Sequence, residues 1–369
     1  MDDKIEKISE HTIKKFELLE KYVYEWAVKL LNYGECKTLI YIDCMCNNGE
    51  YIYGKEIILG SGPRIVKTLN ELALKHLEKK IIIIFNDIDN DKIEHLKKLV
   101  YSNQKNVELK FYIKDANVLL QEIQGIIKKE NTHYLLFYDP YQAKIDWRAI
   151  GPYLNRWGEV IINHMISDSI RAIKEVKSPE AKEKYENTYL KSIEQLIPYG
   201  SDRSSYENRI NEIIKNLSSR KNCYIASFPI FNKNNSLMYD IVHITSNING
   251  FKLFKKCAWQ IFEGKSSNKK LYGKETQITM DFDSDEGMLK SYTDNYCYNI
   301  SNIVDYLYQN FKYRGIVSKK VLWECLDNHP VFPSDSFKKD IIKELKDTYG
   351  IRVSKSTLDF GKEIIDEES

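Results

Sequence analysis

The segment TLIYIDCMCNNGEY, residues 38–51, joins an apolar run to a turn of small and polar residues. The run TLIYID (38–43) has the length and the branched side chains of a buried strand. Asp43, two cysteines, two asparagines and a glycine come at its end. Two interpretations are open: either Cys44 and Cys46 hold a metal ion, or the turn is shaped so that a cofactor can approach the backbone.

Four further apolar runs predict more strands of the same sheet, because segments with helical periodicity separate the successive runs. The apolar runs are IIIIFND (81–87), VELKFYIKD (107–115), HYLLFYD (133–139) and EVIINHM (159–165). The helical segments are 63–78, 91–102, 117–129 and 146–154. This alternation predicts an α/β fold with a parallel sheet covered by helices on both faces. Two last strands, 222–231 and 238–247, are joined by the polar turn NKNNS and indicate a hairpin.

The order of these patterns predicts how the chain is divided. The expected parts are an N-terminal helical region (1–36), the sheet domain (37–262) with a charged helical insertion at about 167–220, a polar linker (263–297) and a C-terminal domain (298–360). In the last part, three helical segments (298–312, 318–328 and 334–350) precede a short β-wing (351–360), which is the pattern of a winged helix-turn-helix. Ser318 is the expected cap of the second helix, and Ser334 or Asp335 that of the third.

The overall composition is that of an ordinary globular protein of 369 residues with a net charge of +2, so it carries no general signal for a polyanion. The longest purely apolar run, 81–85, is too short to cross a membrane, and the charged N-terminus has no signal-peptide core. We therefore expect no membrane partner. Seven scattered cysteines, an odd number, predict a reducing cytoplasm rather than a disulfide framework.

Acidic residues end four successive predicted strands, at Asp43, Asp87, Asp115 and Asp139. Ligands of open α/β sheets bind beyond the carboxyl ends of the strands, so these acids are expected at one edge.

A nucleoside cofactor needs a tight turn, an acid for its ribose hydroxyls and a side chain near its adenine. The chain has no GxGxxG and no phosphate-binding lysine loop, which makes NAD and ATP less favoured. S-adenosylmethionine (SAM) has no phosphate and is the predicted cofactor. The alternative for any single acid is a helix N-cap.

Together, several segments of the chain resemble the three-Cys-motif partner (TcmP) family. The segments are IDCMCNNGEYIYG and GSGP (42–63), FNDID (85–89), KDAN (114–117), DPYQAKIDW (139–147) and VIINHM (160–165). The resemblance covers residues from about 12 to 355. It implies a Rossmann-like class I SAM-methyltransferase fold, a C-terminal winged helix, and a partner protein that carries three cysteines and looks like a radical-SAM protein. Three positions depart from the family pattern: Asn47 in the turn, the additional Gly62, and Gln142 after the aromatic residue.

The candidate site residues fall into two groups. The predicted cofactor-binding residues are Asp43, Cys46, Asn47, Gly49, Asp87 (on the ribose), Asp115 and Ala116 (near the adenine). The predicted catalytic residues are Asp139, Pro140, Tyr141 and Asn163. Asp139-Pro140-Tyr141 resembles the motif with which amino-group methyltransferases hold a substrate amine, where the acid and the proline carbonyl accept its hydrogen bonds and the aromatic ring stacks on a base that has been flipped out. The alternatives are a strand-ending turn and, for Asn163-His164, an interior hydrogen bond.

Two thiolates at Cys44 and Cys46 are fewer than the four ligands of a structural zinc site, and no CxxC or histidine pair lies nearby. We therefore predict packing roles for them and no metal site. In the C-terminal domain, the candidate phosphate contacts are Lys338, Lys339, Lys343, Lys346, Arg352 and Lys355. Residues 298–369 hold 11 basic and 12 acidic residues, so a solvated helix face or a protein contact is the alternative.

The leading prediction is a SAM-dependent methyltransferase that acts on a nucleobase amine together with a three-Cys partner protein, with DNA or RNA as a further partner. The first alternative is a methyltransferase-like subunit without activity that binds nucleic acid or acts as a scaffold; Asn47, Gly62 and Gln142 favour it. The second is a winged-helix regulator whose N-terminal domain senses a nucleoside.

Overall fold

The computed structural model describes residues 5–142, 144–165, 176–196, 223–270 and 297–362. Within these ranges, seven strands form one sheet in the order β5-β4-β1-β6-β7-β9-β8. The strands are β1 (Thr38–Asp43), β4 (Lys80–Asp87), β5 (Val107–Ile113), β6 (Thr132–Tyr138), β7 (Gly158–His164), β8 (Tyr224–Phe231) and β9 (Leu237–Thr245). Six of these strands run in the same direction, and β9 runs antiparallel to them. The predicted Rossmann-like sheet, mostly parallel with a terminal antiparallel hairpin, is confirmed.

The central strand β1 shows why these strands have uninterrupted apolar sequences. Ile40 lies opposite Ile82 on β4 and Tyr134 on β6. The side chains of Leu39 and Tyr41 belong to the apolar cluster on one face of the sheet, and that of Ile40 belongs to the cluster on the other face. A strand covered on both faces needs apolar side chains at every position, so its sequence does not alternate.

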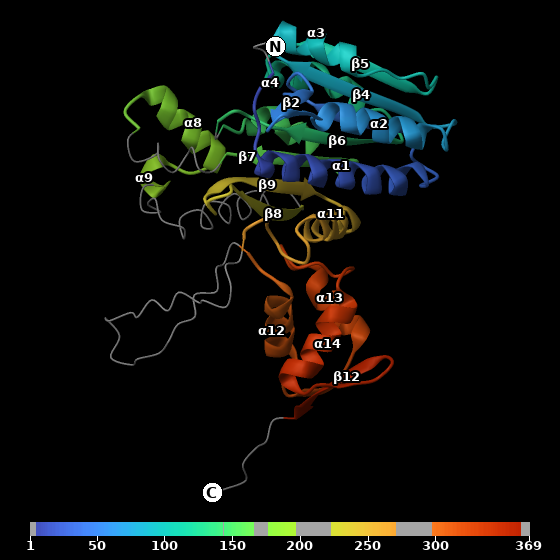
Figure 1. The fold of residues 1–369 in the computed structure, drawn as a ribbon, viewed down its shortest axis with the longest axis vertical. Helices are drawn as coiled ribbons and strands as arrows, with labels where there is room; N and C mark the ends of the chain where they lie inside the picture. The colour runs from blue at the N-terminus through green and yellow to red at the C-terminus, as the bar shows by residue number, and fades with distance from the viewer. Residues whose placement is uncertain (1–4, 143, 166–175, 197–222, 271–296, 363–369) are drawn as a thin grey trace, which may run out of the picture.

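Two layers of helices cover the sheet (Figure 1). One face carries α1 (Glu10–Leu31), α2 (Ser61–Ala73), α3 (Asn90–Leu99) and α11 (Ile248–Ile261). The other carries α4 (Ala116–Glu122), α5 (Gln124–Ile127), α6 (Trp147–Ile150), the 3-10 helix η1 (Gly151–Tyr153), α8 (Pro179–Tyr189) and α9 (Ile193–Leu196). The helices α8 and α9 belong to the predicted insertion; its residues 167–175 and 197–220 lie outside the described ranges.

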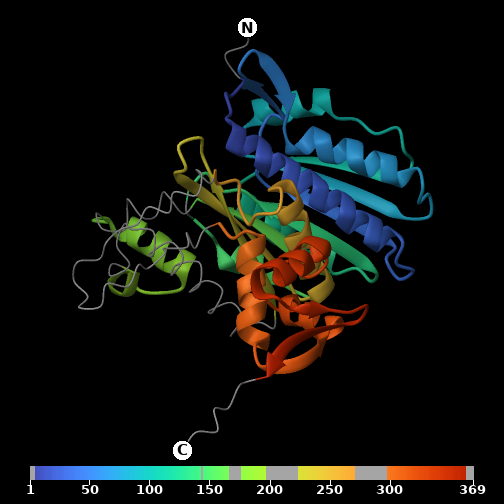
Figure 2. The same ribbon diagram turned by 60° about the horizontal axis from the view of Figure 1, so that its bottom comes forward.

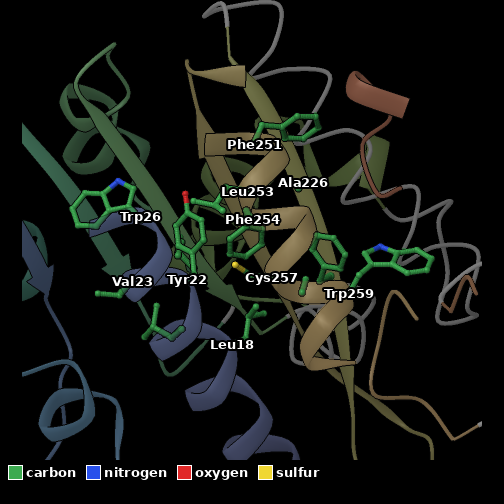
Figure 3. Close-up of a cluster of buried hydrophobic side chains, with 14 of the residues drawn as sticks. Leu18, Tyr22, Val23, Trp26, Ala226, Phe251, Leu253, Phe254, Cys257 and Trp259 are labelled. Atoms are coloured by element: carbon green, nitrogen blue, oxygen red, sulfur yellow. The ribbon is translucent and has the colours of Figure 1, made fainter. Parts of the chain in front are cut away.

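The first layer is held together by contacts between α1, which precedes the sheet in the sequence, and α11, which follows its last strand (Figure 3). Tyr22 and Val23 of α1 and Phe254 and Cys257 of α11 are fully buried there. The rings of Tyr22 and Phe254 meet edge to face, with their centroids 5.0 Å apart. Because each large buried side chain contributes about 1.5–3 kcal/mol, this contact fixes α1 firmly on the sheet.

A short hairpin that the sequence analysis did not predict follows the turn after β1. It consists of β2 (Glu50–Tyr53) and β3 (Glu56–Leu59), with Gly54 at a φ of +64° in the tight turn between them. The N-terminal segment lies alongside β2, because the amide of Ile8 donates to the carbonyl of Ile52 and the amide of Ile52 donates to the carbonyl of Glu6, both at 2.9 Å. The hairpin thus holds residues 6–8 near the carboxyl end of β1.

The C-terminal unit contains three helices and a three-stranded antiparallel sheet in the order β10-β12-β11. Its elements are α12 (Ile300–Phe311), β10 (Arg314–Ser318), α13 (Lys319–Asp327), α14 (Lys338–Tyr349), β11 (Arg352–Val353) and β12 (Thr357–Lys362). Ser318 caps α13 as expected, since its side chain accepts from the amide of Val321. The expected cap of α14 at Ser334 or Asp335 is wrong: α14 begins at Lys338, after Phe337 with a φ of +58°.

The C-terminal unit lies beside α11 (Figures 1 and 2) and is joined to it by buried polar contacts. The Nζ of Lys255 donates to the carbonyls of Leu326 and Asp327, both at 3.1 Å, and of His329, at 2.7 Å. A cation at these carbonyls complements the negative end of α13. The indole nitrogen of Trp259 donates to the carbonyl of Val331 at 2.9 Å. These bonds hold the unit in a defined position on the sheet domain.

All seven cysteines carry free thiols. No helix in the described part of the chain is long and apolar enough to cross a membrane. Of the predicted linker, residues 265–270 pack against the β8–β9 hairpin, with Ser266, Ser267 and Lys269 buried. Residues 271–296 lie outside the described ranges.

Candidate functional site

The carboxyl ends of β1, β4, β6 and β7 bring four of the predicted site residues to one edge of the sheet. Asp43 is fully buried, and Asp87 and Asn163 are 4% and 2% exposed. Asp139 follows β6 and is half-buried. Buried polar groups at the ends of parallel strands are what a ligand site of an open α/β sheet requires.

The turn after β1 has the backbone conformation that the sequence indicated. Asn47 has a φ of +56° and Gly49 a φ of +84°. The positive φ favours glycine at position 49, and a Cβ atom there would also lie 2.6 Å from a methyl carbon of Leu96. The side-chain oxygen of Asn47 accepts from the amide of Asn48 at 2.6 Å, which folds this side chain back onto its own turn. The turn therefore stays tight although asparagine occupies a position where the family has glycine.

The acids at the strand ends have different roles. Asp87 accepts from the amides of Asn47 and Asp89, both at 3.0 Å, and so connects the ends of β1 and β4. Asp89 caps α3 through the amide of Asp91. Asp115 is exposed and caps α4 by accepting from two amides, while the neighbouring Ala116 is buried. The N-cap interpretation thus describes Asp115 in this structure, whereas Asp87 caps no helix.

Asp139 is held by two partners from different elements. Lys15 of α1 donates to its Oδ2 at 2.7 Å, and the side-chain amide of Asn163 donates to its Oδ1 at 2.6 Å. The remaining oxygen of Asn163 is buried and has no hydrogen-bond partner among the described residues. Because the amide nitrogen is committed to Asp139, this oxygen is an acceptor without a donor. We call Lys15, Asp43, Asp139 and Asn163 the edge cluster.

Asp43 is the most perturbed acid of the edge cluster. Burial and, as the second cause, the neighbouring charge of Asp139 raise the pKa of its carboxyl to about 7, against the amide of Met45 and the charge of Lys15, which lower it. Desolvation and a like charge both disfavour the ionised form. A carboxyl that titrates near neutral pH at the end of the central strand can respond to a bound cation.

A chain of hydrogen bonds, which we call the polar bridge, crosses the edge above Asp87. The Nζ of Lys92 donates to Glu6 at 3.0 Å and to the hydroxyl of Tyr141 at 2.7 Å. Glu6 also accepts from the side-chain amide of Asn47 at 3.2 Å. Tyr141 is 68% exposed, whereas the preceding Pro140 is buried. The polar bridge connects the N-terminal segment, α3 and the segment after β6.

Neither cysteine of the first turn faces the other. Cys46 packs in the cluster under α1 and α2, and Cys44 in the cluster under α4, on the opposite face of the sheet. The thiol of Cys44 donates to the carbonyl of Phe137 at 3.2 Å. Burial raises the pKa of both thiols. No group of metal-ligating side chains is found among the described residues. His164 forms an interior hydrogen bond to Tyr189 at 3.1 Å.

Lys15 is the residue that sequence reasoning missed. It lies 124 positions from Asp139 in the chain. A signal was present, since Lys15 stands one and two turns before Leu19 and Tyr22 and thus on the apolar side of α1. A lysine on a buried helix face needs a partner. Glu6 and Lys92 gave no comparable signal, because both lie in polar surroundings.

The six predicted phosphate contacts of the C-terminal unit lie in three different surroundings. Lys339, Lys343 and Lys346 are exposed on one side of α14, and Arg352 and Lys355 are exposed on the wing. Lys338 instead lies over the ring of Trp323, with its Nζ 5.2 Å from the ring centre.

Comparison with protein-family models and with curated proteins finds no match. Solved methyltransferases are similar in structure. The O-methyltransferase TomG of Streptomyces achromogenes, in complex with SAM, has 9% identity and a TM-score of 0.33, over 65% of this chain and 92% of that chain. An O-methyltransferase from Bacillus cereus, in complex with SAH, has 9% identity and a TM-score of 0.33, over 61% and 80%. Human methyltransferase-like protein 13, in complex with SAH, has 9% identity and a TM-score of 0.31, over 73% and 98%.

These likenesses are remote, and the sheet itself defines the fold class. The strand order, the single antiparallel strand and the two helical layers define a Rossmann-like, methyltransferase-like fold.

Proposed function

We propose that the protein is a SAM-dependent methyltransferase that acts on a nucleobase amine. The observation that carries the proposal is the buried oxygen of Asn163, which lacks a donor and lies beside Asp139 at the edge where ligands of such sheets bind. An unpartnered buried acceptor costs about 1–3 kcal/mol, and a ligand with an N–H group removes that cost.

The residues at this edge fit SAM. The backbone at Asn47 and Gly49 allows a close approach, as both have positive φ. Each oxygen of Asp87 accepts one amide and keeps a lone pair for a ribose hydroxyl. Ala116 and the exposed Asp115 stand at the end of β5, where the adenine would lie. When bound, SAM supplies an electrophilic methyl group on a positively charged sulfur.

The edge cluster would position the amine that receives the methyl group. The oxygen of Asn163 accepts one N–H of the amine, which directs the nitrogen lone pair toward the methyl donor. Lys15 fixes Asp139, and Asp139 in turn fixes the amide of Asn163. Tyr141, with an exposed ring, can stack on a base. Such a reaction depends on alignment more than on acid–base chemistry.

We also propose that the C-terminal unit is a winged helix-turn-helix, with α14 as its recognition helix, and that a three-Cys protein is the partner. Support for the first comes from the element order and the hairpin of β11 and β12. The exposed stripe of Lys339, Lys343 and Lys346 on α14 supports contact with DNA or RNA. The partner rests on the resemblance to the TcmP family.

A subunit without activity is the second candidate, and one observation favours it. The polar groups at the edge bind each other, because Lys15 pairs with Asp139 and Lys92 joins Glu6 to Tyr141. These bonds compete with a substrate amine and with the cofactor.

Transfer of labelled methyl groups separates the two candidates. The protein is incubated with methyl-tritiated SAM and with single-stranded DNA, RNA or protein in turn, and Asn163→Ala is compared with Asn70→Ala. Asn70 is the matched control, because it bonds Tyr101 and Ser102 far from the edge cluster. The proposal predicts label in a nucleobase, with the rate lowered at least about 100-fold by Asn163→Ala alone. Binding of SAM without transfer to any acceptor would support the second candidate.

A further inference from the structure

A cavity of about 190 Å³ lies between the start of α1, the turn of the β8–β9 hairpin and the segment after α11. Four of its lining residues are lysines: Lys14, Lys233, Lys265 and Lys270. Buried aromatic rings of Phe231 and Phe262 contribute to its wall. None of these residues belongs to the edge cluster or to the lysine stripe of α14.

The wall of this lysine cavity is built by specific hydrogen bonds. Asn268 accepts from the amide of Phe231 and donates to its carbonyl, both at 2.7 Å. Asn235 accepts from the amide of Lys270 at 3.0 Å and donates to its carbonyl at 2.9 Å. Two asparagines thus fasten residues 268–270 to the hairpin, so the lysines on this segment have a fixed backbone.

The charge of the lysine cavity is positive. Its lining holds the four lysines against two acids, Glu10 and Glu263. Lys14 is paired with Glu17 at 2.9 Å, outside the lining. No carboxylate among the described residues forms an ion pair with the other three lysines. Amino groups gathered around a concave surface without carboxylate partners favour an anion.

The side chain of Tyr239 contacts both a residue that lines the lysine cavity and a residue of the edge cluster. The hydroxyl of Tyr239 donates to the carbonyl of His11, which lines the cavity, at 3.0 Å. The Nζ of Lys15 lies 5.4 Å from the centre of the same ring. His11 and Lys15 are one turn apart on α1, which corresponds to about 6 Å. A base at the edge cluster and a phosphate in the cavity could therefore belong to one nucleotide.

We propose that the lysine cavity binds a phosphate group of the methyl acceptor, so that the acceptor is a nucleotide unit. This inference rests on the proposed function, because it names the substrate class of the same site. Lysine is a point-charge ligand for phosphate and needs no planar partner. The cavity takes the phosphate of the nucleotide whose base reaches Asn163, and the α14 stripe is not required for that contact.

The test uses the full-length protein and a fluorescein-labelled single-stranded oligonucleotide of eight nucleotides, as DNA and as RNA, followed by anisotropy. The variant Lys233→Gln/Lys270→Gln changes two exposed lysines of the cavity and leaves its hydrogen-bonded wall intact. The matched control, Lys75→Gln/Lys105→Gln, removes the same charge from exposed positions near the opposite edge of the sheet. A third variant, Lys343→Gln/Lys346→Gln, measures how much the lysine stripe of α14 contributes to binding of the oligonucleotide.

We expect the cavity variant to bind the oligonucleotide about tenfold more weakly than the wild type at low salt, and the control to bind unchanged. The slope of log affinity against log salt should fall by about 0.7 for each phosphate contact that is lost. Competition by AMP at millimolar concentration would identify a mononucleotide as the source of the phosphate, and competition by oligonucleotides alone would identify a nucleic acid. Calorimetry with SAM should give the same affinity for all four proteins.

The proposal is overturned if the cavity variant binds as tightly as the wild type, if the control weakens binding equally, or if neither AMP nor the oligonucleotide binds at low salt. Loss of SAM binding in the wild type, together with phosphate binding that depends on the cavity, would reject the proposed function and leave the anion site standing. SAM binding without cavity-dependent phosphate binding would reject this inference alone.

Discussion

Helix α1 and strand β7 contribute to two buried polar clusters, and only one of them resembles a site. Tyr22, Glu159 and His243 form the buried triad, in which Glu159 binds both the tyrosine hydroxyl and, at 2.7 Å, the Nε2 of His243. The edge cluster takes Lys15 from the same helix and Asn163 from the same strand. Tyr22 is seven residues beyond Lys15, two helical turns or about 10 Å further along.

The difference lies in access rather than in chemistry. Each cluster has a buried atom without a partner among the described residues, namely the Nδ1 of His243 and the Oδ1 of Asn163. The ring of His243 is fully buried and stacks on Phe254 at 4.4 Å, so no ligand reaches it. Asn163 instead adjoins the half-buried Asp139. An unpartnered buried atom thus indicates a ligand site only where the fold leaves a route to it.

The largest expected effect is on the buried triad. Glu159→Ala removes the acceptor of two buried groups and should lower the free energy of unfolding by about 3–5 kcal/mol. Unfolding in urea measures it, with Glu56→Ala on exposed β3 as the control. The SAM affinity of the folded variant should equal that of the wild type. A loss below about 1 kcal/mol would mean that the triad is not a structural element.

The second effect concerns the pH dependence that Asp43 gives to stability. Because its pKa is raised from 3.8 to about 7 in the folded state, the folded protein binds the proton more tightly. The cost of ionising Asp43 is therefore absent below pH 4, grows between pH 4 and 7, and is complete above pH 7. Between pH 5 and 8 this one group should destabilise the wild type by about 2.5 kcal/mol.

Asp43→Asn should remove that loss, so the variant should be the more stable protein at pH 8 and gain little at pH 5. Urea unfolding at both pH values measures the difference, and Asp347→Asn, at an exposed position on α14, should leave the pH dependence unchanged. Equal pH dependence in Asp43→Asn and the wild type would contradict the burial of a titrating carboxyl at this position.

The sequence predicted the sheet well because the strands are covered on both faces, which imposes long apolar runs such as IIIIF in β4. It failed for β2 and β3, which are four residues each and largely exposed, although Gly54 at the first position of a two-residue turn was a usable signal. It also misplaced the start of α14, because Phe337 takes a positive φ that its side chain does not predict.

For the site, local patterns were enough to predict that Asp43, Asp87, Asp139 and Asn163 lie at one edge, because residues that follow parallel strands meet at the carboxyl ends of those strands. The contacts that these residues form could not be predicted, because they depend on how distant segments pack. The bond from Lys15 to Asp139 depends on how α1 is rotated against the sheet, and the packing of Tyr22 against Phe254 fixes that rotation. Local sequence indicates that Lys15 needs a partner, but it does not identify a partner in a distant segment.

The third expected effect concerns the contribution of Lys15 to stability and to its pH dependence. Lys15→Met removes the partner of Asp139 and a charge that lowers the pKa of Asp43, so the pH at which stability falls should move upward. The direct loss of stability should be about 1–2 kcal/mol, since Asp139 is only partly buried. Lys14→Met is the neighbouring control, because its partner Glu17 lies on the same helix. An unchanged pH midpoint in Lys15→Met would separate α1 from the edge cluster.

The smallest expected effect is at Asp115, which caps α4 and is also a predicted contact of the cofactor. Asp115→Ala removes the cap of α4 and should cost about 1 kcal/mol of stability. Asp115→Ser keeps a capping oxygen and removes the carboxylate, so it should preserve stability. If both variants bind SAM more weakly, the carboxylate contacts the cofactor; if both bind it normally, Asp115 is only a cap.

The most direct test of the account is calorimetric titration of the protein with SAM and with S-adenosylhomocysteine, using two acids that lie two residues apart. Asp87→Ala changes the acid that joins the ends of β1 and β4, and Asp89→Ala changes the acid that caps α3. The account predicts saturable binding of SAM by the wild type, weakened at least about tenfold by Asp87→Ala and unchanged by Asp89→Ala. No binding by the wild type, or an equal loss in both variants, would contradict a cofactor site at this edge.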